Sequence, residues 1–275
     1  MPAARPAACR VTSLWQRWAA HRTARRTARA LARRPIPDLL WQLTLARMPF
    51  MAARPAHDLA ALRQLASLFL DDKEFTGAGG LVVDDAMAVC IAAQACLPVL
   101  RFGLAPYRSF VGIVVHADEV LARREITDEH GIVHAFDEPL TGEAMAGGPV
   151  MLSWRDVAES GESAEWGYNV VIHEFAHVLD MGDGDADGVP PLPTAAARQQ
   201  WVAVIDPAFE QFCADVDAGI TTLLDPYGAT NLAEFFAVAS EHFFVAPNEL
   251  RATHPDVYGL LARYFDQDPA AFSGA

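Results

Sequence analysis

"NVVIHEFAHVLDMGDGDADG", the stretch from Asn169 to Gly188, contains an H-E-x-x-H motif made of His173, Glu174 and His177. Residues four apart share one face of an α-helix, so both histidines can bind one metal ion while Glu174 lies beside an open coordination position. Apolar residues fill most other positions from 170 to 179, which predicts a helix buried on nearly all sides. The motif therefore predicts hydrolysis by a zinc-activated water, with Glu174 as the general base.

The alternative is that these three side chains belong to an ordinary core. The two histidines would then be satisfied by hydrogen bonds, and Glu174 would pair with an arginine. Burying two histidines and a carboxylate in an apolar helix is costly without a shared purpose, which favours the metal. A catalytic zinc site usually has three protein ligands, so the motif is one ligand short.

Three acidic residues are candidates for the third ligand. Asp183 lies six residues after His177, where metzincins place their last ligand, but those proteins have glycine at the position held here by Asp180. Asp180 is one turn after His177, so it either orients a ligand histidine from behind or has an ordinary role at the helix end. The third candidate, Glu234, is remote in the sequence.

Glu234 lies in "LDPYGATNLAEFFAVASEHFF", residues 224–244, seven residues before Glu241 and on the same face of a predicted helix. Two carboxylates on one face of an aromatic-rich helix indicate a cation. Asn231 and Glu234 also have the spacing of a capping box, in which Glu234 would only close the start of the helix. The spacing alone leaves both interpretations open.

From about Pro35 to Pro269 the chain resembles the Mlc titration factor A group of zinc-dependent peptidases, whose catalytic core is related to the anthrax lethal factor protease. The segments that carry the likeness are "LFLDDKEFTGAGGL", "IAAQACLPVLRFGL", "NVVIHEFAHVLDMGDGDADGVPPLP", "DPYGATNLAEFFAVASEHFF" and "YFDQDP". The resemblance implies one zinc ion per chain, held by His173, His177 and Glu234.

The same resemblance implies roles for the residues around the ion. Glu174 would be the general base, and Tyr227 would donate a hydrogen bond to the tetrahedral oxyanion, although a tyrosine after proline is often a packed turn residue. Asp180 and Glu241 are expected to support the ligands from behind. The implied function is an aminopeptidase-like zinc peptidase acting on peptide substrates and linked to the control of sugar-uptake regulation. The alternative is a protein that sequesters an Mlc-type repressor, with little or incidental hydrolysis.

Charge is distributed unevenly along the 275 residues. Nine of the 21 basic residues, and no acidic ones, lie in positions 1–34. The remainder has 12 basic against 35 acidic residues, a net charge of −23, which should repel nucleic-acid phosphates. Residues 1–34 are predicted to be a basic arm, flexible or loosely helical, with an anionic membrane surface, an acidic partner or a transit peptide as alternatives. Residues 35–275 are predicted to form a single metallopeptidase domain.

The fold class follows from the order of the predicted elements. Apolar periodicity and breakers predict helices from 36 to Pro49, over 57–75 and from 86 to near Pro98. They also predict strands over 109–116 and 148–154, and a hairpin or extended loop between those strands. With the two motif helices, this order predicts an α+β, helix-rich, zincin-like metallopeptidase domain with a small sheet beside the active-site helix.

Two further features bear on location and on other metals. The four cysteines lack C-x-x-C spacing, and no apolar run reaches the roughly 18 residues of a membrane span, so we expect a cytoplasmic protein without a transmembrane segment. Residues Asp183 to Gly188 open like a calcium loop, but Thr194 stands where that loop needs a bidentate glutamate. A turn-rich acidic loop is expected there instead.

Overall fold

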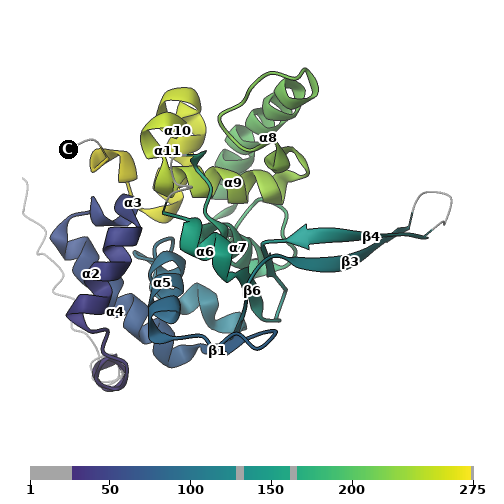
Figure 1. Cartoon of the computed structure of the whole chain (residues 1–275). Coiled ribbons are helices and arrows are strands. Elements are labelled where there is room, and N and C mark those ends of the chain that lie inside the picture. The colour runs from purple at the N-terminus through teal and green to yellow at the C-terminus, as the bar shows by residue number, and fades with distance from the viewer. Residues whose placement is uncertain (1–26, 128–132, 162–165, 274–275) are drawn as a thin grey trace, which may run out of the picture.

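The computed structural model describes residues 27–127, 133–161 and 166–273, which form a helix-rich α+β structure around a small sheet (Figure 1). The helices are α2 (Asp38–Arg47), α3 (Pro49–Ala52), α4 (Ala56–Asp72), α5 (Asp85–Cys96), α6 (Trp154–Glu159), α7 (Val170–Asp180), α8 (Ala195–Asp217), α9 (Leu232–Val245), α10 (Pro247–Thr253) and α11 (Pro255–Phe265). The strands are β1 (Glu74–Gly77), β2 (Gly112–His116), β3 (Val120–Thr127), β4 (Val133–Leu140), β5 (Gly142–Ala144) and β6 (Val150–Ser153). This architecture confirms the predicted fold class.

The main sheet has four strands in the order β1-β2-β6-β5. β1, β2 and β6 are parallel, with Phe75 opposite Ile113 and Ile113 opposite Val150. β5 runs antiparallel to β6, with Gly142 opposite Leu152, and forms one edge of the sheet. This edge strand lies against α7, so the sheet does stand beside the motif helix.

The stretch between the two predicted strands forms a hairpin, one of the two alternatives that the sequence left open. β3 and β4 pair antiparallel from Val120 opposite Leu140 to Thr127 opposite Val133. In Figure 1 this two-stranded ribbon projects from the body of the molecule.

α7 occupies the centre of the molecule, between α5 and α9 (Figure 1). Its Phe175 is fully buried, and the rings of Tyr107, Phe69 and Phe110 surround it at centroid distances of 4.9, 5.7 and 5.9 Å. Aromatic pairs at such distances add to the stabilisation from burial alone. The motif helix is therefore fixed by a packed core.

One predicted helix is shorter than expected. The helix predicted over 57–75 ends at Asp72, and the chain continues as β1. The next residue, Lys73, is extended, and its buried ammonium group donates hydrogen bonds to the carbonyls of Tyr107 at 2.5 Å and Phe110 at 2.7 Å. This buried amine ties the end of α4 to the segment before β2, which favours strand over further helix.

The predicted arm, residues 1–34, lies mostly outside the described residues. Residues 27–33 are helical, and Arg33 donates hydrogen bonds to the Asp71 carboxylate on α4 at 2.8 and 2.5 Å. The described end of the arm therefore contacts α4.

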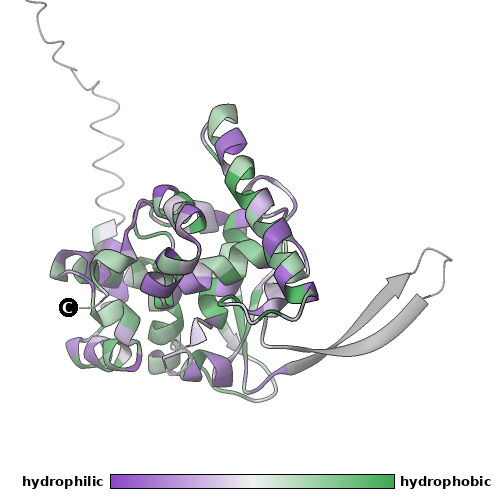
Figure 2. Cartoon of the chain, turned by 90° about the horizontal axis from the view of Figure 1, so that it is seen from above, coloured by the Kyte–Doolittle hydropathy of each residue, from purple (hydrophilic) through white to green (hydrophobic). Residues whose placement is uncertain are grey.

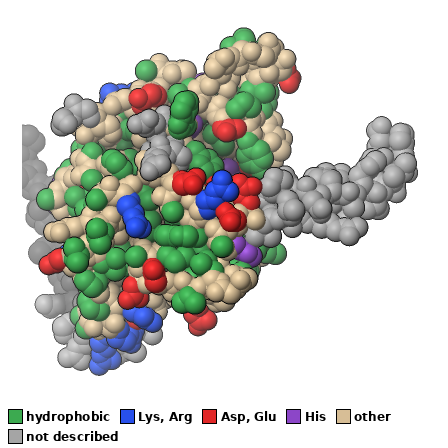
Figure 3. Space-filling view, in the orientation of Figure 1, with side chains coloured by type: hydrophobic (Ala, Val, Ile, Leu, Met, Phe, Trp, Pro, Cys, Tyr) green, Lys and Arg blue, Asp and Glu red, His purple; other side chains and the backbone are tan. Residues whose placement is uncertain are grey.

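The outer helices show the mixture of hydrophobic and hydrophilic residues expected of helices with one buried face (Figure 2). In Figure 3, acidic and basic side chains are interspersed with hydrophobic ones over the visible face. Within residues 27–127, 133–161 and 166–273, every helix is too short or too polar to cross a membrane.

Candidate metal centre

The centre is built on α7, which begins at a capped asparagine. Asn169 lies just before the first helical residue, and its Oδ1 accepts a hydrogen bond from the Ile172 amide at 2.9 Å. Asparagine is among the preferred residues at this position because it satisfies an amide that the helix leaves unpaired. With the helix start fixed there, His173 and His177 both face α9, one turn apart.

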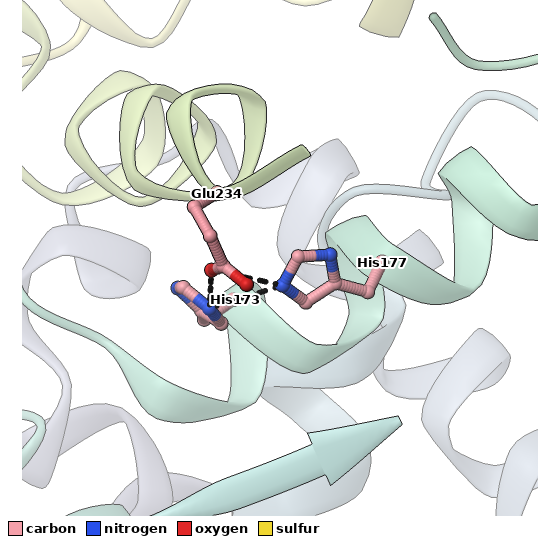
Figure 4. A group of neighbouring side chains, drawn as sticks. All are labelled: His173, His177 and Glu234. Atoms are coloured by element: carbon pink, nitrogen blue, oxygen red, sulfur yellow. Dashed lines mark hydrogen bonds and ion pairs between the residues drawn. The ribbon is translucent and has the colours of Figure 1, made fainter. Parts of the chain in front are cut away.

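Three donor atoms converge between α7 and α9 (Figure 4). His173 Nε2 lies 3.1 Å from His177 Nε2 and 3.1 Å from Glu234 Oε2, and His177 Nε2 lies 3.3 Å from the same carboxylate oxygen. Among the described residues, this is the group of histidine, cysteine and acidic side chains that could share one ion. The side chains of all three are partly accessible, at 12%, 13% and 16%.

The spacing of these atoms suits a small tetrahedral cation. Zinc bonds of about 2.0–2.2 Å to nitrogen and oxygen place tetrahedral ligands roughly 3.3–3.6 Å apart, close to the separations seen here. Two imidazole nitrogens and a carboxylate oxygen are also donors that zinc accepts. The residues present therefore fit a metal ion with three protein ligands.

Glu234 is placed by the start of α9. Asn231 caps that helix by accepting a hydrogen bond from the Glu234 amide at 3.0 Å, while the Glu234 carboxylate faces the two histidines. Burial raises the pKa of Glu234, but the hydrogen bonds to both imidazoles outweigh it and lower that pKa to about 2. The carboxylate is thus held in its charged form, as a metal ligand must be.

Glu241, which lies on α9 like Glu234, stands behind His173. Its Oε1 lies 2.8 Å from His173 Nδ1, and its Oε2 accepts a hydrogen bond from the Asn169 amide at 2.5 Å. A carboxylate can only accept, so His173 carries a proton on Nδ1, which it donates to Glu241. This is the tautomer that can bind a metal through Nε2, and such carboxylate–histidine pairs are usual behind metal ligands.

Glu174 is buried, with 5% of its surface exposed, beside the edge strand β5. A Cβ atom on Gly142 of that strand would come within 2.5 Å of Glu174 Oε1, so only glycine leaves space for the carboxylate. Burial raises the pKa of Glu174 to about 7, although the nearby histidines lower it. A carboxyl group with that pKa can take up and release a proton near neutral pH.

Tyr227 stands at the solvent side of the histidines, with 49% of its surface exposed. It belongs to the 3₁₀ turn Pro226–Ala229, where its amide donates to Asp225 Oδ1 at 2.8 Å. Its ring centroid lies 6.2 Å from that of His173. The phenol therefore lies next to the candidate centre and is accessible to a substrate.

The two aspartates near the end of α7 lie apart from this group. Asp180 is fully buried; its Oδ2 accepts from the Gly188 amide at 2.8 Å, and its Oδ1 has no hydrogen-bond partner among the described residues. Burial raises the pKa of Asp180 to about 6. Through this bond Asp180 connects the acidic loop to the end of α7. Its predicted role in orienting His177 stays a prediction. Asp183 is exposed and is absent from the group of three.

Two cavities meet at the candidate centre. One, of about 400 Å³, and another, of about 470 Å³, share Gly142, His173, Glu174 and Tyr227 in their walls. A larger cavity of about 760 Å³ reaches the end of α7 at Leu179 but contains none of these side chains. The centre thus has space on two sides for a substrate.

Sequence reasoning missed two residues of this site. Asn169 carried a usable signal, because an asparagine directly before an apolar helical run is typical of a helix cap. Gly142 carried no usable signal, because β5 is only three residues long and follows a segment without clear hydrophobic periodicity.

Comparison with known proteins agrees with this geometry. The family model described as glucose-regulated metallo-peptidase M90 matches residues 21–266, which includes the last part of the predicted arm. The chain belongs to this family. It is also 32% identical over 236 residues to Mlc titration factor A of Salmonella arizonae, covering 85% of this chain and 92% of the relative.

Two further relatives are similar to this chain along most of their length. Mlc titration factor A of Serratia proteamaculans is 33% identical over 234 residues, 84% of this chain and 88% of the relative. An uncharacterized protein of Synechocystis sp. is 36% identical over 241 residues, 87% of each chain. Membership of a metallopeptidase family implies a metal, and the three converging side chains are where the structure could hold it.

Proposed function

We propose that this member of the M90 family is a zinc-dependent peptidase whose ion is held by His173, His177 and Glu234. The observation that carries the proposal is the convergence of two imidazole nitrogens and one carboxylate oxygen within 3.3 Å of one another. They face two cavities that also contain Glu174 and Tyr227. When bound, zinc would lower the pKa of a water ligand and polarise a peptide carbonyl.

Each remaining step falls to side chains of this chain. Glu174 takes the proton of the attacking water and delivers it to the leaving amine, which its raised pKa allows. Tyr227 donates its phenol proton in a hydrogen bond to the oxyanion of the tetrahedral intermediate. Glu241 holds His173 in the required tautomer and orientation.

The edge strand β5 offers a way to hold the substrate. Gly142 to Ala144 line the 470 Å³ cavity together with both histidines and Glu234. A peptide in extended conformation can add to a sheet edge through main-chain hydrogen bonds. Such pairing along β5 would bring its backbone past Glu174.

The 400 Å³ cavity supports the narrower proposal that the enzyme removes residues from a free amino end. Its wall contains Asp156 and Asp225 in addition to Glu174 and Glu241, and no lysine or arginine among the described residues. An acidic cavity beside the scissile bond favours the ammonium group of an N-terminal residue and disfavours a carboxylate.

Acetylation of the substrate tests this narrower proposal. Removing the ammonium charge of an alanine or leucine anilide should lower kcat/KM by roughly 10- to 100-fold. This factor corresponds to the free energy of one hydrogen bond to a charged group. Asp156→Asn should lower kcat/KM for the free amine and leave the acetylated substrate unaffected. Equal hydrolysis of both substrates would exclude an aminopeptidase preference.

Glu174→Gln tests the peptidase itself. The variant should retain zinc, because Glu174 is not a ligand, while peptide hydrolysis falls by about 10²- to 10⁴-fold, the usual contribution of a general base. Zinc content and hydrolysis are measured on the same preparation. Hydrolysis at the parental rate would refute the mechanism.

A second candidate function is supported by the names of the relatives. A protein called Mlc titration factor A suggests that the chain binds a transcriptional repressor of the Mlc type. Sequestration would survive Glu174→Gln, since the exposed surface is unchanged, whereas a function based on hydrolysis would not. Repressor binding by that variant, measured beside its hydrolysis, separates the two.

A further inference from the structure

Gln94 is an amide in the middle of an otherwise apolar helix. It is fully buried on α5, where its neighbours Ile91, Ala93 and Ala95 are also fully buried. Burying an amide is unfavourable unless its hydrogen bonds are made. Gln94 makes them on both sides: Nε2 donates to the Cys90 carbonyl at 3.2 Å, and Oε1 accepts from Asn169 Nδ2 at 2.7 Å.

The bond to Gln94 fixes the side chain of Asn169. Asn169 uses both ends of its amide, since Nδ2 donates to Gln94 and Oδ1 accepts from the Ile172 amide that begins α7. A flipped amide would place oxygen against oxygen at Gln94 and N–H against N–H at Ile172. Because the Cys90 carbonyl also fixes the amide of Gln94, one arrangement of the pair is favoured.

The backbone of Asn169 then reaches the candidate centre. Its amide donates to Glu241 Oε2 at 2.5 Å, and Glu241 Oε1 lies 2.8 Å from His173 Nδ1. Asn169 and Gln94 are fully buried, and Glu241 is 2% exposed, so solvent does not compete for these bonds. A continuous series of hydrogen bonds therefore runs from α5 through the start of α7 to a candidate metal ligand.

We propose that Gln94 and Asn169 are positioning residues for His173, acting through Glu241. The inference rests on the proposed zinc site. By holding the N-terminus of α7 and the Glu241 carboxylate in one arrangement, the pair fixes the direction in which His173 Nε2 points. The simpler role, in which Gln94 only satisfies a buried amide and Asn169 only caps a helix, would affect stability and leave metal binding unchanged.

Two substitutions separate these roles. Gln94→Met keeps the length and apolar stem of glutamine but removes the acceptor for Asn169. Asn169→Ser keeps an oxygen suited to capping α7 but loses the link to Gln94. Ile91→Val, one turn earlier on α5 and equally buried, is the matched control for loss of core packing.

The test measures the zinc dissociation constant of each full-length variant by competition with a chromophoric chelator, with the melting temperature recorded alongside. Each single variant should bind zinc about tenfold more weakly, as expected when the support behind a ligand is lost. The double variant should bind no more weakly than the worse single variant, because both act through one connection. Ile91→Val should lower the melting temperature and leave zinc affinity unchanged. Cobalt-loaded Gln94→Met should also show an altered visible spectrum.

Two results would overturn the inference. If both single variants bind zinc as tightly as Ile91→Val while melting earlier, Gln94 and Asn169 are merely structural, and the proposed peptidase stands. If the parent protein binds no zinc at all, the proposed metal centre and this inference fall together.

Discussion

Two clusters of buried polar residues in this molecule differ in the balance of their charges. In the first, between α4 and the C-terminal helices, Arg54 donates to Gln267 at 2.8 Å, and Asp58 is paired with Arg101 at 2.9 Å. Burial lowers the pKa of Arg54 to about 10, although Asp58 raises it. This cluster combines two arginines with one aspartate and one neutral amide, all supplied by the chain itself.

The second cluster is the candidate metal centre. There the carboxylates of Glu174, Glu234 and Glu241 gather around two histidines and form no ion pair with lysine or arginine among the described residues. Buried charges are usually paired or coordinate metals. Both clusters thus bury polar residues, and the candidate metal centre differs by an excess of acceptors without a lysine or arginine among the described residues.

The largest expected effect follows from removing a ligand in the acidic cluster. Glu234→Ala should empty the zinc site and reduce peptide hydrolysis to background, because two histidines alone do not hold a catalytic zinc. Asn231→Ala is the control: it removes the cap of α9 at a cost of about 0.5–2 kcal/mol while the carboxylate remains. If metal analysis found zinc at full occupancy in Glu234→Ala, Glu234 would not be a ligand and would serve only the start of α9.

Loss of the phenol should have the next effect. Tyr227→Phe removes a hydrogen-bond donor from an exposed ring, so folding and zinc content should be unchanged. If the donor serves only the oxyanion, kcat should fall by about 10²-fold with little change in KM. A change in KM alone would instead indicate that Tyr227 contacts the substrate in its ground state.

Glu241→Gln should have a smaller effect, on metal affinity. Glutamine cannot accept from both the Asn169 amide and His173 Nδ1, so His173 is driven toward the tautomer with a proton on Nε2. Zinc affinity should fall by about 10- to 100-fold. Unchanged affinity in the competition assay would show that His173 is oriented without this carboxylate.

The cluster around Asp58 should respond in stability alone. Asp58→Asn leaves two buried or half-buried arginines without their partner, so the free energy of unfolding should fall by about 3–5 kcal/mol. The folded variant should still bind one zinc and hydrolyse peptides at the parental rate. Denaturant unfolding and metal content, measured together, check both parts, and loss of zinc from folded protein would erase the contrast between the clusters.

Periodicity predicted the elements that lie in the core. α5, α7 and α9 are almost entirely apolar, so their positions could be assigned from sequence, and the spacing of His173 and His177 placed both on one face. The distance from Glu234 to the histidines could not be obtained in this way. The capping-box spacing allowed two interpretations, and only the packing of α9 on α7 shows the carboxylate beside both rings.

Other parts of the site depend on contacts between segments far apart in the chain. Gln94 and Asn169 are 75 positions apart, and Gln94 interrupts an apolar run without any sign of its partner. Glycine is required at position 142 only because β5 passes close to the Glu174 side chain. A three-residue strand also has too few residues to show alternation. Such features need the arrangement of the elements, which local patterns do not carry.

Anomalous X-ray scattering at the zinc edge, from crystals of the zinc-loaded protein, tests the central claim most directly. One zinc ion should lie within about 2.0–2.2 Å of His173 Nε2, His177 Nε2 and a Glu234 oxygen, with a further position open to water. A zinc ion bound instead by the acidic loop at Asp183, or no zinc between α7 and α9 in excess metal, would contradict the account.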